Sequence, residues 1–366
     1  MKNHGRSWLL LAALYCFFSP MVQASCEFNQ GTGYITALKS YTIPLSGTIS
    51  VPPGTPVGKE IYRLQIKFAN QGWLYVKCSS SGQFYQGYDY LTTPLLPSDY
   101  STAVYQTGVP GIGVKFVYGS SQGDFPLRKA SCIGKNCNFP SGWGALSTVV
   151  FIKTADVVTA GIIEGNQLPT ALYSFGQNDS MLDVYEVSLS GSLQVTSPTC
   201  NITAASKTMT VNMGKQKITA FTGKGATTEW KNASIQLANC GRFYGNIPSG
   251  YIVGNFDGSS TFVPDPDIIN NYLSITLTPL NGSEDAAKGI MKIADHPLKA
   301  TGIGIQLSTS ESTSGLVNLA SPTLQTLPKD GRQVITVPLY ARYIQTENSV
   351  IAGKANGLLE YVITYQ

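Results

Sequence analysis

Charged residues and histidines are scarce in this 366-residue chain. Only 13% of its residues are charged, and 25 basic against 21 acidic side chains give a formal net charge of +4. No basic run or basic-aromatic stripe occurs, so the sequence gives no reason to expect a nucleic-acid partner. The two histidines are His4, which lies in an N-terminal leader, and His296. A Ser-His-Asp hydrolase would depend on His296 alone, and we do not expect one.

Long apolar runs are also absent, apart from one near the N-terminus. Basic residues precede the apolar segment Trp8–Phe18, which is followed by the small-residue sequence Val22-Gln23-Ala24. This order is typical of a secretory signal peptide, and the apolar part is shorter than the ~20 residues that a membrane-spanning helix needs. We expect residues 1–24 to be removed on export and the mature protein to be soluble.

Glycine and proline are abundant, with 37 and 20 copies, and leave little room for long helices. Short segments with apolar residues at every second position, such as residues 64–68, are separated by turn residues throughout the chain. We therefore expect an all-β protein with two β-sandwich domains. The first spans residues 25–195, a linker covers 196–199, and the second spans 200–366, each long enough for one sandwich core.

Seven cysteines are present, and the loss of Cys16 with the leader leaves six. An even set in an exported chain favours disulfides over metal sites. Zinc is disfavoured because no C-x-x-C pair occurs, and Asp257, Asp265 and Asp267 lack the spacing of a calcium-binding EF-hand loop. Six cysteines allow fifteen pairings. Simple nesting within two domains favours Cys26 with Cys78, Cys132 with Cys137, and Cys200 with Cys240.

The C-terminal stretch has a strong strand pattern. Its apolar residues occupy every second position and predict a half-buried strand: Leu359, Tyr361, Ile363 and Tyr365. Upstream, residues 337–343 read V-P-L-Y-A-R-Y and residues 350–353 read V-I-A-G. A chain with these motifs and this ending resembles the pilin subunits of the chaperone-usher pathway.

The resemblance implies that the second domain is an incomplete immunoglobulin-like sandwich that lacks its last strand. In such pilins a periplasmic chaperone lends a strand to the open groove, an outer-membrane usher receives the complex, and the next pilus subunit replaces the lent strand. This exchange is a known case of strand addition. Leu359, Tyr361, Ile363 and Tyr365 would form the interface with both partners. A Cys200–Cys240 bond also fits the family.

The first domain is similar, more diffusely, to the lectin-like N-terminal domains of two-domain fimbrial adhesins. A whole domain stands where other subunits carry the strand that they donate, which implies a position at the tip of a cell-surface fimbria. The resemblance implies binding of a host or surface glycan, with no enzymatic activity, cofactor or metal. Three alternatives stay open: a protein-binding adhesin, a non-binding adaptor or assembly-initiating subunit, and an exported glycosidase that uses Asp89 and Asp99.

Two segments of the first domain combine aromatic rings with amide and carboxylate groups, as lectin sites do. The first segment is 83–90 with the nearby pair 99–100, and its candidate ligand-binding residues are Tyr85, Tyr88, Asp89, Tyr90, Asp99 and Tyr100. The second is the short loop that begins at Cys132, with candidates Asn136, Asn138 and Trp143. The same aromatic residues could instead form cross-strand pairs or cover an end of the sandwich.

Overall fold

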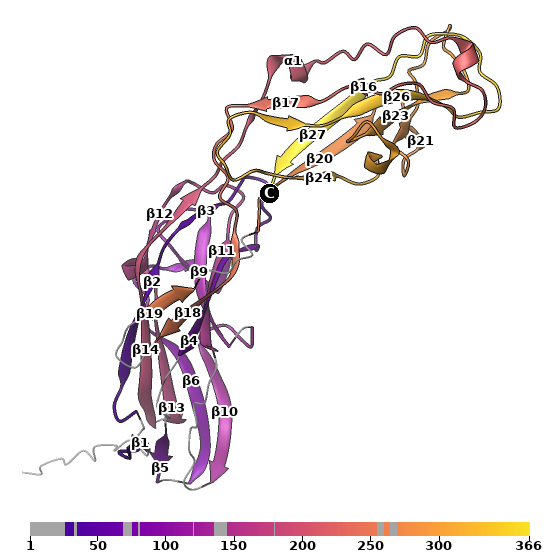
Figure 1. Ribbon diagram of the computed structural model, residues 1–366. Coiled ribbons are helices and arrows are strands. Elements are labelled where there is room, and N and C mark those ends of the chain that lie inside the picture. The colour runs from indigo at the N-terminus through magenta and orange to yellow at the C-terminus, as the bar shows by residue number, and fades with distance from the viewer. Residues whose placement is uncertain are drawn as a thin grey trace, which may run out of the picture.

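The chain forms two elongated lobes that meet near the middle of the sequence (Figure 1). This computed structural model describes residues 26–32, 35–68, 75–79, 81–119, 121–134, 145–178, 180–254, 260–263 and 269–366. The expected signal peptide, residues 1–24, lies outside the described residues. The N-terminal half, indigo to magenta in Figure 1, builds the first lobe, and most of the C-terminal half, orange to yellow, builds the second.

The first lobe is a sandwich of two large sheets. One sheet has the order β10 (Leu127–Gly134), β6 (Gly82–Thr92), β13 (Thr170–Gln177), β14 (Ser180–Thr196) and β12 (Gly161–Glu164), with β2 (Lys39–Leu45) and β3 (Thr48–Ser50) parallel to β14. The other has the order β19 (Ser260–Val263), β18 (Ile247–Gly254), β4 (Glu60–Phe68), β11 (Ala145–Lys153), β9 (Ile112–Tyr118), β8 (Ser101–Gln106) and β7 (Pro97–Ser98).

The core of the first lobe follows the alternation of the strands. Leu64 and Ile66 on β4, like Val114 and Phe116 on β9, are fully buried. Each pair occupies every second position of its strand, as a strand with one face on a core requires. The alternating pattern of these segments therefore predicted their inward faces.

The second lobe consists of smaller sheets around a separate core. The first sheet has the order β15 (Asn201–Ile202), β17 (Ile235–Ala238) and β25 (Ile335–Val337). The second has the order β16 (Lys231–Asn232), β26 (Tyr340–Gln345), β23 (Ile303–Ser308), β22 (Ile290–Met291) and β21 (Ser283–Asp285). The third has the order β24 (Thr323–Thr326), β20 (Tyr272–Pro279) and β27 (Leu359–Tyr365). The all-β expectation is confirmed, because the helical turns are short: α1 (Ala204–Lys207), η1 (Gly165–Gln167), η2 (Ile218–Ala220) and η3 (Thr313–Gly315). In the described part of the chain, no helix has the length and apolar character needed to cross a membrane.

The two sequence motifs near the C-terminus have clear packing roles. The Arg342 guanidinium lies 4.2 Å from the ring centre of Trp230 and donates to Gln306 Oε1. The Tyr343 hydroxyl donates to the carbonyl oxygen of Ala355, 2.9 Å away. A Cβ atom on Gly353 would come within 2.4 Å of the main chain at Lys299 and Ala300, so this close crossing requires glycine.

Disulfides tie the start of each lobe. Cys26 on β1 (Cys26–Phe28) is bonded to Cys78 on β5 (Val76–Cys78), where the two residues face each other in an antiparallel pair. In the second lobe Cys200 is bonded to Cys240. Cys132 also forms a disulfide, but Cys137, its expected partner, lies outside the described residues.

One hairpin departs from the expected domain division. Strands β18 and β19 belong to the second half of the sequence but pair with β4 of the first lobe. Figure 1 shows these two orange strands among the purple strands of the first lobe. A division into 25–195 and 200–366 therefore leaves part of the first lobe's sheet in the second segment. This pairing could not be predicted, because local alternation does not encode which distant strands become partners.

Candidate functional site

A long apolar groove runs through the second lobe. It has a volume of about 740 Å³ and lies between residues 207–214 on one side and residues 355–361 on the other. Its floor is made of core side chains: Ala233, Ile235, Met291, Ile305, Leu307, Leu339, Ala341 and Tyr343. Buried core residues of this lobe therefore form the floor of the groove beside β27.

The main chain of β27 has one free edge. Hydrogen bonds of 2.7 and 2.8 Å join Tyr272 and Gln366 in both directions. Such doubly bonded pairs alternate with unbonded pairs along an antiparallel ladder. The even-numbered residues 358–366 thus bond to β20, and the N–H and C=O groups of odd-numbered residues 359–365 point the other way. Among the described residues, no strand pairs with that second side of β27.

The four apolar residues predicted for this strand line that free edge. Leu359, Tyr361, Ile363 and Tyr365 are all partly buried and pack against the core of the second lobe. Two of them also bond to the segment that precedes residues 207–214. The Tyr361 hydroxyl donates to the Ser206 carbonyl at 2.6 Å, and the Tyr365 hydroxyl donates to the Cys200 carbonyl at 3.1 Å. Burial raises the pKa of both tyrosines.

A glycine keeps the groove open near its middle. A Cβ atom on Gly357 would lie 2.5 Å from Ile305 Cδ1 and 2.9 Å from Met291 Cε, both on the groove floor. Such contacts are too close for any side chain without rearrangement of the floor. The wall residue Gly357 therefore allows the chain to lie directly on the core.

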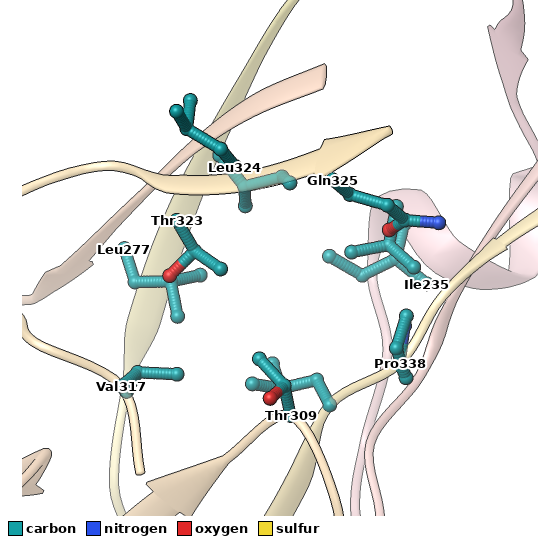
Figure 2. Close-up of a pocket in the computed structure, with 11 residues that line it drawn as sticks. Ile235, Leu277, Thr309, Val317, Thr323, Leu324, Gln325 and Pro338 are labelled. Atoms are coloured by element: carbon teal, nitrogen blue, oxygen red, sulfur yellow. The ribbon is translucent and has the colours of Figure 1, made fainter. Parts of the chain in front are cut away.

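A second, smaller hollow opens on the other edge of the same sheet. It has a volume of about 260 Å³ and lies beside β24, with Thr323, Leu324 and Gln325 on its rim (Figure 2). Ile235 and Leu339 line both hollows. Both hollows therefore reach the core of the second lobe, one beside β24 and one beside β27.

In the first lobe, two of the expected ligand-binding aromatics are core residues. Tyr88 is 3% exposed and its hydroxyl donates to Gln86 Oε1 at 2.5 Å. Tyr90 packs against the core, and its hydroxyl accepts from the Phe116 N–H at 3.1 Å. Burial raises the pKa of each far above its ordinary value. Tyr88 is buried and Tyr90 is partly buried against the core, and a role of either ring in ligand binding stays a prediction.

The other face of the same strand carries polar groups. Strand alternation places Tyr85 and Asp89 on the outer face of β6, with Gly87 between them. Asp89 forms an ion pair with Arg128 of β10. A Cβ atom on Gly87 would collide with Ser174 Oγ and Arg128 Nη1, so these two side chains cover the glycine from either side. A shallow polar surface results at the centre of the sheet.

Acidic side chains continue this surface across the sheet. Register places Ser174 of β13 opposite Asp183 of β14, and Leu172 between Asp89 and Glu186. Glu186 accepts a hydrogen bond from Ser40 at 2.9 Å. Burial raises the pKa of Asp183, and the neighbouring charges of Glu186 and Asp89 add to the shift. We call the surface formed by Tyr85, Asp89, Arg128, Ser174, Asp183 and Glu186 the outer polar face.

The remaining candidates do not join this face. Asp99 and Tyr100 are exposed and lie between β7 and β8, in the other sheet, where the Tyr100 ring approaches Gly58. Asn136, Asn138 and Trp143 lie outside the described residues. Sequence reasoning missed Arg128, Ser174, Asp183 and Glu186, because they come from three other strands and only the sheet brings them to Asp89.

The described residues hold no group of three histidine, cysteine, aspartate or glutamate side chains placed for a metal ion. The ring of His296 is engaged in a loop, where its Nδ1 accepts from the Leu298 N–H at 2.9 Å. Asp257, Asp265 and Asp267 lie outside the described residues.

Comparison with known protein families divides the chain into two parts near residue 190. A family model described as "MrkD-like receptor binding domain" matches residues 45–191, and one described as "Fimbrial protein" matches residues 187–366. A fimbria adhesin protein of Klebsiella pneumoniae is 24% identical over 320 residues, which is 87% of this chain and 89% of that protein. These matches cover both lobes.

Two solved structures are also similar to the chain, at lower sequence identity. The receptor-binding domain of the plasmid-borne adhesin MrkD1P of Klebsiella pneumoniae is 22% identical, with a TM-score of 0.35, over 50% of this chain and all of that domain. The CupB6 tip adhesin of Pseudomonas aeruginosa is 14% identical, with a TM-score of 0.32, over 93% of this chain and 94% of that one. With an MrkD-like receptor-binding domain followed by a fimbrial pilin domain, the chain belongs to the two-domain, non-enzymatic tip adhesins of chaperone-usher fimbriae.

Proposed function

We propose that the groove of the pilin domain is filled by a strand from another protein, which joins this adhesin to its fimbria. The observation that carries the proposal is the free edge of β27 beside an apolar groove of about 740 Å³. An exposed apolar edge associates unless it is covered. A periplasmic chaperone would cover it first, and the next subunit would replace the chaperone after delivery to the outer-membrane usher.

An added strand fits the chemistry of this edge. The main-chain groups of odd-numbered residues 359–363 have no strand partner among the residues that the structure describes and are available for a new ladder, whereas the Tyr365 carbonyl lies close to Gly54 of the first lobe. The side chains on the groove floor are apolar. Each half-exposed apolar side chain that becomes covered contributes about 1 kcal/mol. Main-chain bonds and apolar burial together favour an extended partner with apolar residues at alternate positions.

We further propose that the receptor-binding domain binds a glycan on the outer polar face. Carboxylates such as Asp89 accept hydrogen bonds from sugar hydroxyls, and the Arg128 guanidinium donates them. The half-buried Tyr85 supplies an aromatic ring at the border of the same surface. Many tips on one cell give avidity, so weak binding by each site is sufficient for attachment.

A glycan array probed with the full chain, in complex with its chaperone, tests this assignment. We expect selective binding to one glycan family, reduced at least tenfold by Asp89→Asn and by Arg128→Ala. Asp124→Asn is the matched control, because Asp124 forms an ion pair with Lys115 outside the outer polar face. Unchanged binding by the first two variants would refute the location of the site. If the folded wild type binds deglycosylated matrix protein but no glycan, the receptor is a protein.

A further inference from the structure

The hairpin of β18 and β19 occupies the edge of a sheet that belongs to the receptor-binding domain. β18 runs parallel to β4, with partners from Ile247 and Tyr62 to Gly254 and Phe68, and β19 pairs with β18 on its other side. The hairpin also contacts β2 of the opposite sheet. Without it, β4 would be the edge of the sheet, and the side of the sandwich between β4 and β2 would be open.

The base of the hairpin is closed and anchored. Asn246 and Ile269 exchange two main-chain hydrogen bonds, of 2.9 and 3.1 Å. The carbonyl oxygen of Gly245 accepts from the Ser50 N–H at 3.0 Å, and Ile247 packs against the core of the receptor-binding domain. The segment that carries the hairpin is thus fixed to the first lobe at Gly245 and Ile247.

Asn271 anchors the base of the hairpin through both polar atoms of its side-chain amide. The side chain is 1% exposed; its Oδ1 accepts from the Gly245 N–H at 3.0 Å and its Nδ2 donates to the Ser50 carbonyl at 3.2 Å. The carbonyl of Asn271 accepts from the N–H of Leu327, a fully buried pilin residue. Ser50 is fully buried too, and its hydroxyl accepts from the Tyr244 N–H at 2.8 Å.

Loss of the β4–β18 pairing and of the Ser50–Asn271 contacts would destabilise the first lobe. A bare β4 would expose a row of unpaired main-chain groups beside the buried residues Leu64 and Ile66, and such an edge invites association. Separation of the lobes would also break the hydrogen bonds that the Ser50 N–H, carbonyl and hydroxyl groups make with Gly245, Asn271 and Tyr244. Buried polar groups need such partners unless water replaces them. The joint is therefore part of the fold of the first lobe and does not behave as a free linker.

We propose that the pilin half completes the receptor-binding domain in cis. The β18–β19 hairpin acts as an intramolecular added strand pair that closes the β4 edge, and Asn271 latches it to Ser50. The folding unit of the receptor-binding domain is then residues 26–196 together with 244–271. This inference concerns the joint between lobes and holds whichever receptor the tip binds.

Disulfide trapping in the full chain tests the register directly. Gln65 and Tyr251 are partners on neighbouring strands, so Gln65→Cys with Tyr251→Cys should form a disulfide in the periplasm, detected by peptide mapping. Gln65→Cys with Gly254→Cys is the control, because Gly254 lies three residues further along β18. Free thiols in the first variant, or equal bond formation in both, would overturn the proposal.

A hairpin replacement tests the consequence for stability. Because Asn246 and Ile269 form a doubly bonded pair, residues 247–268 can be replaced by an Asn-Gly turn. We expect amide exchange of residues 60–68 in the full chain to accelerate at least tenfold. Loss of protection in β9 as well would show that the domain needs the hairpin to fold. Unchanged exchange in β4 would refute the proposal.

A single substitution tests the latch. Asn271→Ala should accelerate exchange at β4 and at Ser50, whereas Asn318→Ala should not, because Asn318 is an exposed loop residue that bonds only within its own turn. Equal exchange in the two variants would contradict the role of Asn271.

Discussion

The hydroxyl of Tyr361 donates a 2.6 Å hydrogen bond to the carbonyl oxygen of Ser206 in the pilin domain. The bond shows that the Tyr361 side chain reaches the short helix α1, which contains Ser206. The ring covers the groove floor, and the hydroxyl fixes its position. We expect Tyr361→Phe to keep chaperone binding, because the ring remains, which co-purification of the complex can check. Loss of the complex would mean that the hydroxyl itself is required.

Ile363 should be essential for capture of the partner strand. Its side chain packs on the pilin core beside the groove, so Ile363→Glu would place a charge against apolar residues at a cost of about 3 kcal/mol. We expect at least tenfold less adhesin–chaperone complex in the periplasm. Val362→Glu is the matched control, because Val362 is 53% exposed on the opposite face of β27. Similar yields for both variants would contradict this orientation of the strand.

Displacing the wall of the groove should impair assembly. Gly357→Val would press methyl groups against Ile305 and Met291 and push the wall at residue 357 away from the groove floor. We expect much less adhesin in purified fimbriae. Gly223→Val is the control, because no atom lies within 4 Å of a Cβ atom on Gly223. Normal incorporation of Gly357→Val would argue that the groove is not the joining surface.

Lys153 should stabilise the loop that faces the pilin domain. Its side chain is buried, and Nζ donates to the carbonyls of Pro53 and Thr55 at 2.8 and 2.6 Å. Lys153→Met leaves both carbonyls unpaired and should lower the free energy of unfolding by about 2 kcal/mol. Chemical denaturation measures this. Lys115→Met removes only a partly exposed ion pair and should cost about 1 kcal/mol or less. Equal losses would contradict the buried role of Lys153.

The outer polar face should make stability depend on pH. The pKa of Asp183 is raised in the folded state, so ionisation of this group disfavours folding. The penalty is present above the folded pKa and disappears as the pH falls through it toward the ordinary value. Asp183→Asn should therefore raise the Tm at pH 7 by about 1 °C or less, since the residue is exposed, and change nothing at pH 3. A lower Tm at pH 7 would contradict the shift.

Local patterns revealed the strands and the family but not the sites between strands. Alternation located β4, β9 and β27. The motif residues Arg342 and Gly353 make local contacts in the pilin domain, with Trp230 and with the main chain at Lys299 and Ala300. The dense aromatic segment 83–90 looked like a binding loop, yet it is the regular strand β6, in which Phe84, Tyr88 and Tyr90 face the core and Tyr85 does not. Its acidic residue Asp89 faces outward, where partners from other strands complete the surface.

The domain joint could not be predicted for a related reason. Asn271 and Ser50 are 221 positions apart, and nothing in either segment marks it as a partner of the other. The sequence pattern of residues 247–254 indicates a strand at most, and only tertiary packing decides that it pairs with β4.

The most direct test of the account is amide exchange along β27 in the adhesin, measured with and without its chaperone. The amides of Leu359, Tyr361, Ile363 and Tyr365 face the free edge and should be slowed at least tenfold by the bound strand. The amides of Glu360, Val362 and Thr364 already bond to β20 and should change little. Unaltered exchange at the four odd-numbered residues in a stable complex would contradict strand addition in the groove.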